Sequence, residues 1–267
     1  MTDGVTWVDS HCHVQPGHGP DTLEGSDEVV QRAHAAGVAW MVCVGTDLET
    51  SLRAIDLAGR HPGVRATVGL HPHDASKLGA EWSMLEPLAL DEQVVGIGEA
   101  GFDLYYEYSP RDEQETAFRF QVRLAKDLDR ALVIHSRDAW DDTFRVLEDE
   151  GPPARTVFHC FTGGPTEAQR ALDLGAHLSF SGIVTFRKAL DLRAAAAIVP
   201  DDRLLVETDS PFLTPEPYRG KPNEPALVPV IGAALAAARG IDDTTVARLT
   251  SENAARVFGV RAPSAPH

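Results

Sequence analysis

Eight short runs of apolar, mostly β-branched residues recur along the chain. They lie at residues 5–8, 38–44, 64–70, 94–97, 132–134, 156–158, 177–180 and 204–206. Runs of this length and composition are typical of buried strands. The stretches between them are long enough for helical crossovers, and strict alternation of strand and helix indicates a parallel sheet. We therefore expect eight strands that run in the same direction.

The intervening stretches decide between two parallel-sheet architectures. Apolar residues recur with helical spacing at 28–36, 50–60, 111–128, 138–150, 166–174, 190–198, 227–239 and 243–258. Eight units in 267 residues match a closed barrel. The alternative is an open doubly wound sheet, but no GxGxxG follows the first strand. We expect an α/β fold with a single (β/α)8 TIM barrel over 1–260, an extra C-terminal helix, and a disordered tail over 261–267.

Charge and cysteine content narrow the functional class. The net charge is −16, with 24 Lys and Arg against 40 Asp and Glu, which argues against a broad basic surface for nucleic acid. Cys12, Cys43 and Cys160 are too few and too scattered for a disulfide framework or a thiolate zinc site. No apolar run reaches the roughly 18 residues of a membrane span, and the start lacks a secretory pattern. We expect a cytoplasmic protein without a membrane partner, and a monomer.

Histidines and acidic residues gather where the expected strands end. They are His11 and His13 after the first strand, His71 and His73 after the third, Glu99 after the fourth, His135 after the fifth, His159 after the sixth, and Glu207 and Asp209 after the eighth. In a barrel these ends converge on one mouth. Because strand side chains alternate, His11 and His13 should face the same way, with Cys12 turned outward as a packing thiol.

Imidazole and carboxylate donors together indicate a transition-metal site. They suit Zn²⁺, Mn²⁺, Fe²⁺ or Co²⁺, with Mg²⁺ as a less favoured possibility. The donors outnumber the ligands that one tetrahedral ion needs, and a carboxylate such as Glu99 can bridge two ions roughly 3.5–4 Å apart. The sequence therefore predicts two divalent ions as cofactors.

The same segments, taken in order, carry a family resemblance. They include Asp9-Ser10-His11-Cys12-His13, Gly69-Leu70-His71-Pro72-His73, Gly98-Glu99-Ala100-Gly101-Phe102-Asp103, His135-Ser136-Arg137, Phe158-His159-Cys160-Phe161-Thr162-Gly163, Glu207-Thr208-Asp209-Ser210-Pro211 and Arg219-Gly220-Lys221-Pro222-Asn223-Glu224-Pro225. Over nearly the whole chain this resembles the TatD family, within the amidohydrolase-like TIM-barrel superfamily. The resemblance implies that His11, His13, Glu99 and Asp209 surround one metal, and that Glu99, His135 and His159 surround the other.

Further roles follow from chemistry at the expected mouth. Asp209 is the expected proton-accepting base beside Glu99, and Glu207 is expected to accept a hydrogen bond that fixes a histidine tautomer. His71 and His73 either contact substrate, line the mouth or cap the following turn. The expected phosphate-binding residues are Arg137, Arg219 and Lys221. The other histidines do not lie in these motifs and are expected to be ordinary surface or core residues. They are His18, His34, His61, His177 and His267.

These features favour a metal-dependent phosphodiester hydrolase that uses a metal-activated hydroxide. We expect an end-directed deoxyribonuclease, with a DNA end as substrate and RNA as a second one; the resemblance implies 3′-5′ polarity. One alternative is a metal-dependent ester or amide hydrolase, such as an aminoacyl-tRNA deacylase, which would not need Arg137, Arg219 and Lys221. Another is a non-catalytic binding protein, which the intact ligand set argues against.

Overall fold

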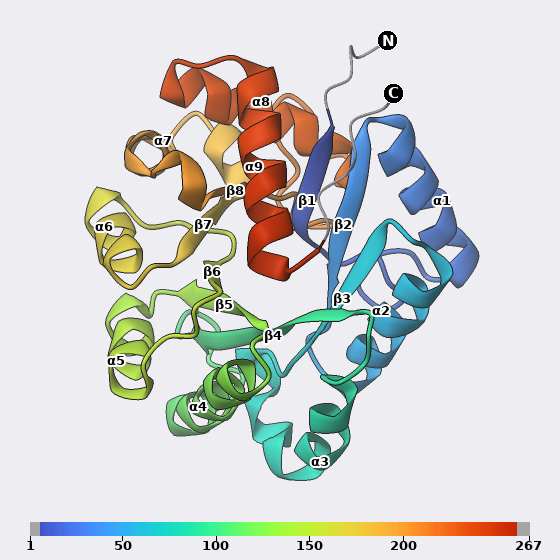
Figure 1. Cartoon of the computed structure of the whole chain (residues 1–267), viewed down its shortest axis with the longest axis vertical. Helices are drawn as coiled ribbons and strands as arrows, with labels where there is room; N and C mark the ends of the chain where they lie inside the picture. The colour runs from blue at the N-terminus through green and yellow to red at the C-terminus, as the bar shows by residue number, and fades with distance from the viewer. Residues whose placement is uncertain (1–5, 261–267) are drawn as a thin grey trace.

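A computed structural model describes residues 6–260. In that range the chain forms eight strands in a single sheet. They are β1 Trp7–Cys12, β2 Val38–Val44, β3 Val64–Val68, β4 Val94–Asp103, β5 Ala131–Arg137, β6 Thr156–Phe158, β7 His177–Phe180 and β8 Leu204–Val206. Their spatial order follows the chain, and every neighbouring pair is parallel. The expected TIM barrel is confirmed (Figure 1).

Between β1 and β8 the barrel closes mainly through side chains. The Asp9 carboxylate accepts hydrogen bonds from the backbone N–H and the hydroxyl of Thr208, at 2.9 and 2.5 Å. The Ser10 hydroxyl donates to the backbone oxygen of Val206 at 3.0 Å. Beyond the strands, the Asp209 N–H donates to the backbone oxygen of His11 at 3.0 Å. Both sides of this seam therefore carry residues expected in the metal site.

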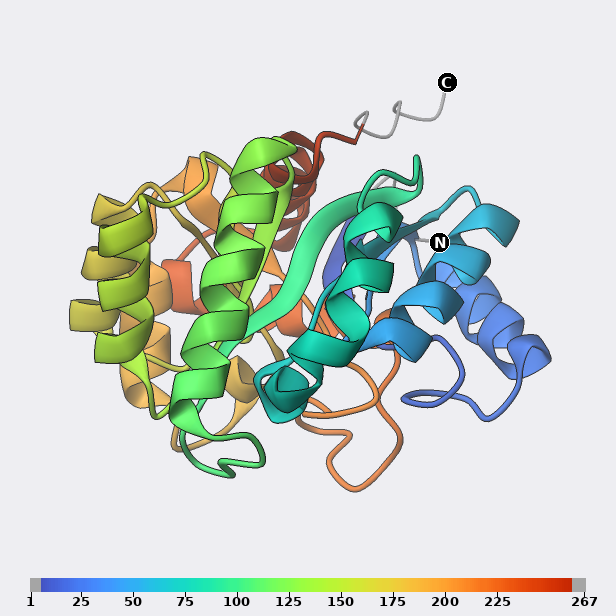
Figure 2. The same cartoon turned by 90° about the horizontal axis from the view of Figure 1, so that it is seen from below.

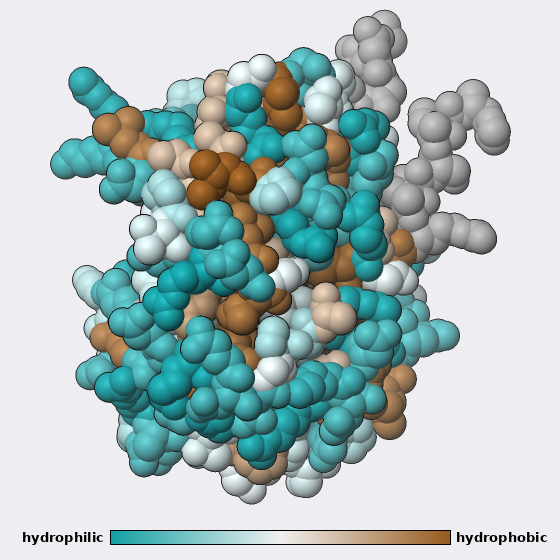
Figure 3. All heavy atoms as spheres, turned by 60° about the vertical axis from the view of Figure 1, so that its left-hand side comes forward, coloured by the Kyte–Doolittle hydropathy of each residue, from teal (hydrophilic) through white to brown (hydrophobic). Residues whose placement is uncertain are grey.

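Helices surround the barrel in the order that the sequence predicts, with one addition. They are α1 Leu23–Ala35, α2 Leu48–Arg60, α3 Leu78–Leu88, α4 Arg111–Asp127, α5 Trp140–Glu150, α6 Pro165–Asp173, α7 Leu190–Ile198, α8 Val228–Arg239 and α9 Asp243–Phe258. Short 3₁₀ turns lie at η1 Pro72–Lys77, η2 Gly182–Thr185, η3 Asp201–Arg203 and η4 Pro225–Leu227. The sequence does not predict α3. On the face in Figure 3, hydrophilic side chains surround a band of apolar atoms.

The C-terminal helix α9 covers the end of the barrel where the strands begin. Its residues Ala254, Val257 and Phe258 pack with inward-facing strand residues such as Val8 and Trp40 in one buried cluster. The βα loops lie at the opposite end: Figure 2 shows them on the lower side, in blue, green and orange. Helix α9 thus covers one end of the barrel, and the βα loops surround the other, where TIM-barrel enzymes carry their active sites.

The remaining predictions concern the end of the chain, its oligomeric state, its location and membrane spans. The tail at 261–267 lies outside the described residues, so the domain limit at 260 stays a prediction, as do the monomeric state and the cytoplasmic location. Within residues 6–260, no single helix is long and apolar enough to cross a membrane. One bent pair, Pro225–Arg239 with Asp243–Phe258 at 109°, passes on length and composition alone.

Candidate metal centre

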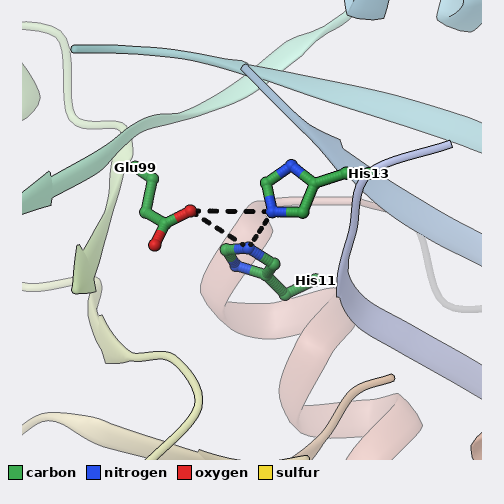
Figure 4. A group of neighbouring side chains, drawn as sticks. All are labelled: His11, His13 and Glu99. Carbon is green, nitrogen blue, oxygen red and sulfur yellow. Dashed lines mark hydrogen bonds and ion pairs between the residues drawn. The ribbon is translucent and has the colours of Figure 1, made fainter. Parts of the chain in front are cut away.

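Strand β1 delivers two imidazoles to the mouth. The Nε2 atoms of His11 and His13 lie 3.2 Å apart, and both rings are buried. Figure 4 shows these two rings and the Glu99 carboxylate pointing toward one another. Cys12, between the histidines, packs in the outer apolar core, and its thiol donates to the Val42 backbone oxygen. The expected alternation of side chains at the end of β1 is confirmed.

Glu99 reaches the centre from β4, between two glycines that allow a close strand pair. Gly98 and Gly101 have φ values of +136° and +141°, and a Cβ at either would collide with the backbone oxygen of Val133 or His135. Only glycine tolerates that combination of conformation and contact. Strands β4 and β5 can therefore approach closely, and the Glu99 carboxylate comes within 2.7 Å of His135 Nδ1.

The two oxygens of Glu99 face two different sets of donors. Oε2 lies 3.5 Å from His11 Nε2 and 3.7 Å from His13 Nε2. Oε1 lies 2.7 Å from both His135 Nδ1 and His159 Nε2. A single carboxylate therefore stands between two nitrogen pairs, which is the arrangement that a bridging ligand requires.

The first set of donors has the spacing of a metal site. Asp209 Oδ1 lies beside it, 3.7 Å from the Nε2 atoms of both His11 and His13. A tetrahedral ion with bonds of roughly 2.0–2.1 Å places its ligand atoms roughly 3.3–3.4 Å apart. The separations that involve the His11 or His13 nitrogen run from 3.2 to 3.7 Å. His11, His13 and Glu99 therefore form a group that could hold a metal ion, and Asp209 is the expected fourth ligand.

The second set is more compact and includes an additional imidazole. His135 Nδ1 and His159 Nε2 are 3.4 Å apart. His71 Nε2 approaches Glu99 Oε1 at 3.4 Å, and His71, Glu99 and His135 together form a group that could hold a metal. His71 also caps η1, because its Nδ1 accepts from the His73 N–H. The structure thus brings His71 to the donors themselves and not only to the rim.

Burial and mutual charge fix the protonation of the centre. Burial lowers the pKa of both His11 and His13, so that their nitrogens carry free lone pairs. Although burial opposes ionisation of Glu99, the positive charge of His159 and other donors hold its pKa well below the ordinary value. Burial raises the pKa of Asp209 well above the ordinary value. The ionised Glu99 carboxylate attracts positive charge, and a divalent cation would supply it.

Glu207 supports the second set from below. Its Oε1 lies 3.3 Å from His159 Nδ1 and accepts the Cys160 N–H at 2.6 Å. Burial works against a charge on His159, yet Glu99 and Glu207 raise its pKa well above the ordinary value. Glu207 therefore lies at ion-pair distance from His159 Nδ1, a nitrogen that has no hydrogen-bond partner among the described residues.

The comparisons with known proteins agree with this geometry. The family model described as TatD related DNase matches residues 8–259. The chain belongs to the TatD family. This TatD-family chain is 38% identical over 254 residues to the "uncharacterized metal-dependent hydrolase YabD" of Bacillus subtilis (strain 168), covering 94% of this chain and 98% of the relative. It is therefore a hydrolase of a metal-dependent family.

Two further TatD relatives extend the comparison. The "3′-5′ ssDNA/RNA exonuclease TatD" of Cronobacter sakazakii is 42% identical over 241 residues, which cover 87% of this chain and 91% of the relative. Among solved structures, the TatD homologue YjjV from Escherichia coli K12 superposes with a TM-score of 0.85 at 27% identity. That match covers 96% of this chain and 99% of the other. The TatD barrel is thus shared along nearly the full length.

Except for His71, the residues expected to bind substrate lie outside the donor cluster of this TatD chain. His73 Nε2 contacts Asp103 Oδ2 at 2.8 Å. The guanidinium of Arg137 lies 4.1 Å from the Tyr105 ring centre. Arg219 lies over the Phe186 ring at 4.4 Å, and Lys221 lies 5.7 Å from the Tyr218 ring centre. The last three are cations that pair with no carboxylate within residues 6–260.

Two residues near the TatD centre were given no role from the sequence. Asp103 Oδ2 contacts His73 and lies 3.4 Å from His135 Nε2, so this carboxylate connects two histidines of the mouth. His18, expected to be ordinary, places its ring 5.1 Å from that of His13 and its Nε2 2.8 Å from the Thr46 hydroxyl. The available signal for Asp103 was its place in the Glu99 motif; His18 had none.

Proposed function

We propose that this chain is a 3′-5′ exonuclease that acts on single-stranded DNA, and also on RNA, with two divalent ions. The proposal rests on the position of the Glu99 carboxylate between two nitrogen pairs. One oxygen lies 3.5–3.7 Å from the first pair, and the other lies 2.7 Å from the second. The Cronobacter sakazakii relative, which is 42% identical and is described as a 3′-5′ ssDNA/RNA exonuclease, supports the polarity and the substrate.

His11, His13, Glu99 and Asp209 would hold one ion, and Glu99, His135 and His159 the other. Two such ions lower the pKa of water and neutralise charge that develops on a phosphate. Asp209 Oδ1, which lies 3.7 Å from the Nε2 atoms of both His11 and His13, would take a proton from the attacking water. Glu207 would orient His159 through Nδ1.

Unpaired cations favour a phosphodiester over an uncharged carbonyl substrate. Arg137, Arg219 and Lys221 have no ion-pair partner in the part of the chain that the structure describes, and each lies against an aromatic ring. An arginine that only balances a neighbouring acid would show that acid within 4 Å. We propose that these three side chains bind phosphates that flank the cleaved bond.

The mouth and the overall charge favour attack at an end. The candidate ligands are buried near the carboxyl ends of the strands. In a barrel the βα loops surround that end, so the reacting bond would lie within a ring of loops and not along an open groove. A chain of net charge −16 lacks a basic track to grip a strand internally. A terminus can enter where a duplex middle cannot.

A linear strand and a closed circle test the proposal. We expect metal-loaded protein to shorten a single-stranded oligonucleotide stepwise from its 3′ end, while a circle of the same composition persists. The Asp209→Asn variant serves as the control for contaminating nucleases. Cutting of the circle as fast as the linear strand would overturn the end-directed model. If no nucleic acid is cleaved with Mg²⁺, Mn²⁺, Co²⁺ or Zn²⁺, ester and amide substrates take first place.

A further inference from the structure

Three tyrosines follow β4 in one short loop at the mouth. Tyr105, Tyr106 and Tyr108 are 59%, 47% and 68% exposed, which is unusual for large rings that could pack inward. Tyr106 and Tyr108 stack on each other, with ring centres 5.3 Å apart and planes 18° from parallel. The loop thus presents aromatic faces to solvent instead of burying them.

A cation completes this surface. The Arg137 guanidinium lies 4.1 Å from the Tyr105 ring centre and 4.7 Å from that of Tyr106. We call Tyr105, Tyr106, Tyr108 and Arg137 the tyrosine wall. No carboxylate within residues 6–260 pairs with Arg137, so its charge is available to a ligand.

The tyrosine wall is fixed to the candidate metal centre. Asp103 Oδ1 accepts the backbone N–H groups of Tyr105 and Tyr106 at 3.0 and 2.9 Å. The other oxygen of Asp103 contacts His73 at 2.8 Å and lies 3.4 Å from His135 Nε2. The His73 ring meets the Tyr108 ring edge to face at 4.7 Å. One carboxylate therefore sets the distance between the exposed rings and a proposed metal ligand.

We propose that the tyrosine wall binds unpaired nucleobases by stacking and so selects single strands, an inference that rests on the proposed function. Aromatic side chains bind bases of any sequence through their faces, and arginine adds a cation–π contribution and a phosphate contact. In a duplex those faces are covered by neighbouring pairs. Rings that are half exposed beside a phosphodiester site thus give strand selectivity without basic surface.

Binding, measured apart from cleavage, tests the wall. We would load the Asp209→Asn protein with metal and titrate it against a 5′-labelled single strand, and against a strand whose three 3′-terminal residues are abasic. In this background Tyr106→Leu/Tyr108→Leu removes two rings but keeps the backbone bonds to Asp103. We expect the dissociation constant for the base-bearing strand to rise about tenfold or more, and that for the abasic strand to stay within about twofold.

Two matched variants separate ring stacking from other effects. Tyr106→Phe/Tyr108→Phe keeps the rings and should bind both strands as the parent does. Phe120→Leu removes an exposed ring on α4, 42% exposed and packed on Trp82, and should also leave binding unchanged. Loss at Phe120 equal to that at the tyrosines would overturn the proposal.

The remaining outcomes are decisive. The proposal is overturned if the leucine variant weakens binding of the base-bearing and abasic strands equally. It is also overturned if that variant weakens binding of neither strand. A parent protein that binds neither strand overturns it as well. A base-dependent difference in binding together with no cleavage by the unsubstituted protein leaves the wall standing and refutes the exonuclease. Cleavage by the unsubstituted protein without a base-dependent difference in binding supports the exonuclease and refutes the tyrosine wall.

Discussion

The two ends of the barrel are built from the same eight strands but differ in what they bury. At the closed end, inward side chains such as Val42, Val133 and Leu205 pack with α9 in an apolar cluster. At the mouth the buried side chains include four histidines and several acids. Apolar burial contributes stability wherever it occurs, whereas buried charge is costly unless it is paired or bound to a metal. The comparison predicts that stability depends on one end and chemistry on the other.

Removal of metal should have the largest effect and should act at the mouth alone. We expect chelated protein to lose essentially all turnover while it stays folded, because the apolar closed end does not depend on ions. Restored activity should require two equivalents of a divalent ion, measured by elemental analysis beside the rate. Full activity at one equivalent would contradict the two-metal proposal, and unfolding on chelation would contradict the division between the two ends.

The second-largest effect is expected from Asp209→Asn. This substitution should lower kcat by about 10²–10⁴-fold, since the amide cannot accept the proton. The unfolding midpoint of the metal-free protein should stay near the parental value, because burial raises the pKa of Asp209 well above its ordinary value and the side chain is already neutral there. Asp129→Asn is the matched control: it lies before β5 at the closed end and shares a positive φ, +47° against +53°. Near parental kcat in the Asp209 variant, with metal content unchanged, would transfer the role of base to another acid such as Glu207.

At the closed end, Phe258→Ala should reverse this pattern. Phe258 is 2% exposed in the α9 cluster and meets Trp40 edge to face at 6.4 Å. Loss of a buried ring costs about 3–5 kcal/mol of unfolding free energy through transfer and cavity terms. We expect denaturant titration to show that loss, with kcat within about twofold in the folded protein. A large fall in kcat with little lost stability would show that α9 communicates with the mouth.

A smaller, pH-dependent effect sharpens the comparison at His177. This buried residue opens β7 at the closed end, and burial, with the nearby charge of Arg203, lowers its pKa from 6.5 to about 4. As pH falls below 6.5, His177 of the unfolded chain binds a proton before His177 of the folded chain does, which favours unfolding. The free energy of unfolding is therefore highest above pH 6.5 and falls by about 3 kcal/mol as pH falls toward 4.

The measurement is urea unfolding of metal-free protein at pH 7 and pH 4. His177→Leu removes the titrating ring, and the difference between the two pH values should shrink by about 3 kcal/mol relative to the parent. If parent and variant lose stability equally on acidification, the buried neutral histidine makes no contribution.

Predictability from sequence follows the same division. Four strands, β2, β6, β7 and β8, have the predicted limits, and each is buried over nearly its whole length. Strands β1 and β4 instead run on to Cys12 and Asp103, through polar residues that the pattern interprets as loop. Those polar stretches are buried within strands, where the site overrides the ordinary alternation of apolar and polar residues.

Helix α3 and Asp103 show two other limits. Helix α3 contains Pro87, and of its described side chains only Leu85 is buried, so no apolar face marks it in the sequence. The sequence does not assign Asp103 a role because its partners lie elsewhere in the fold, His73 in η1 and His135 in β5. The ligand positions could be proposed because each closes a strand. Which donors share an oxygen of Glu99 depends on distances that only the fold defines.

The seam between β1 and β8 has a consequence for how the protein is made. His11 and His13 leave the ribosome among the first residues, whereas Asp209, which meets them at 3.7 Å, emerges almost two hundred residues later. Contacts of such sequence separation form late in folding, because closing a long loop costs entropy before any contact compensates it. A nascent chain that ends before β8 has the second nitrogen pair and Glu99 but lacks Asp209. On the proposed role of Asp209, incomplete products of translation would be inert, and the protein would become active only once nearly its whole length has been synthesised.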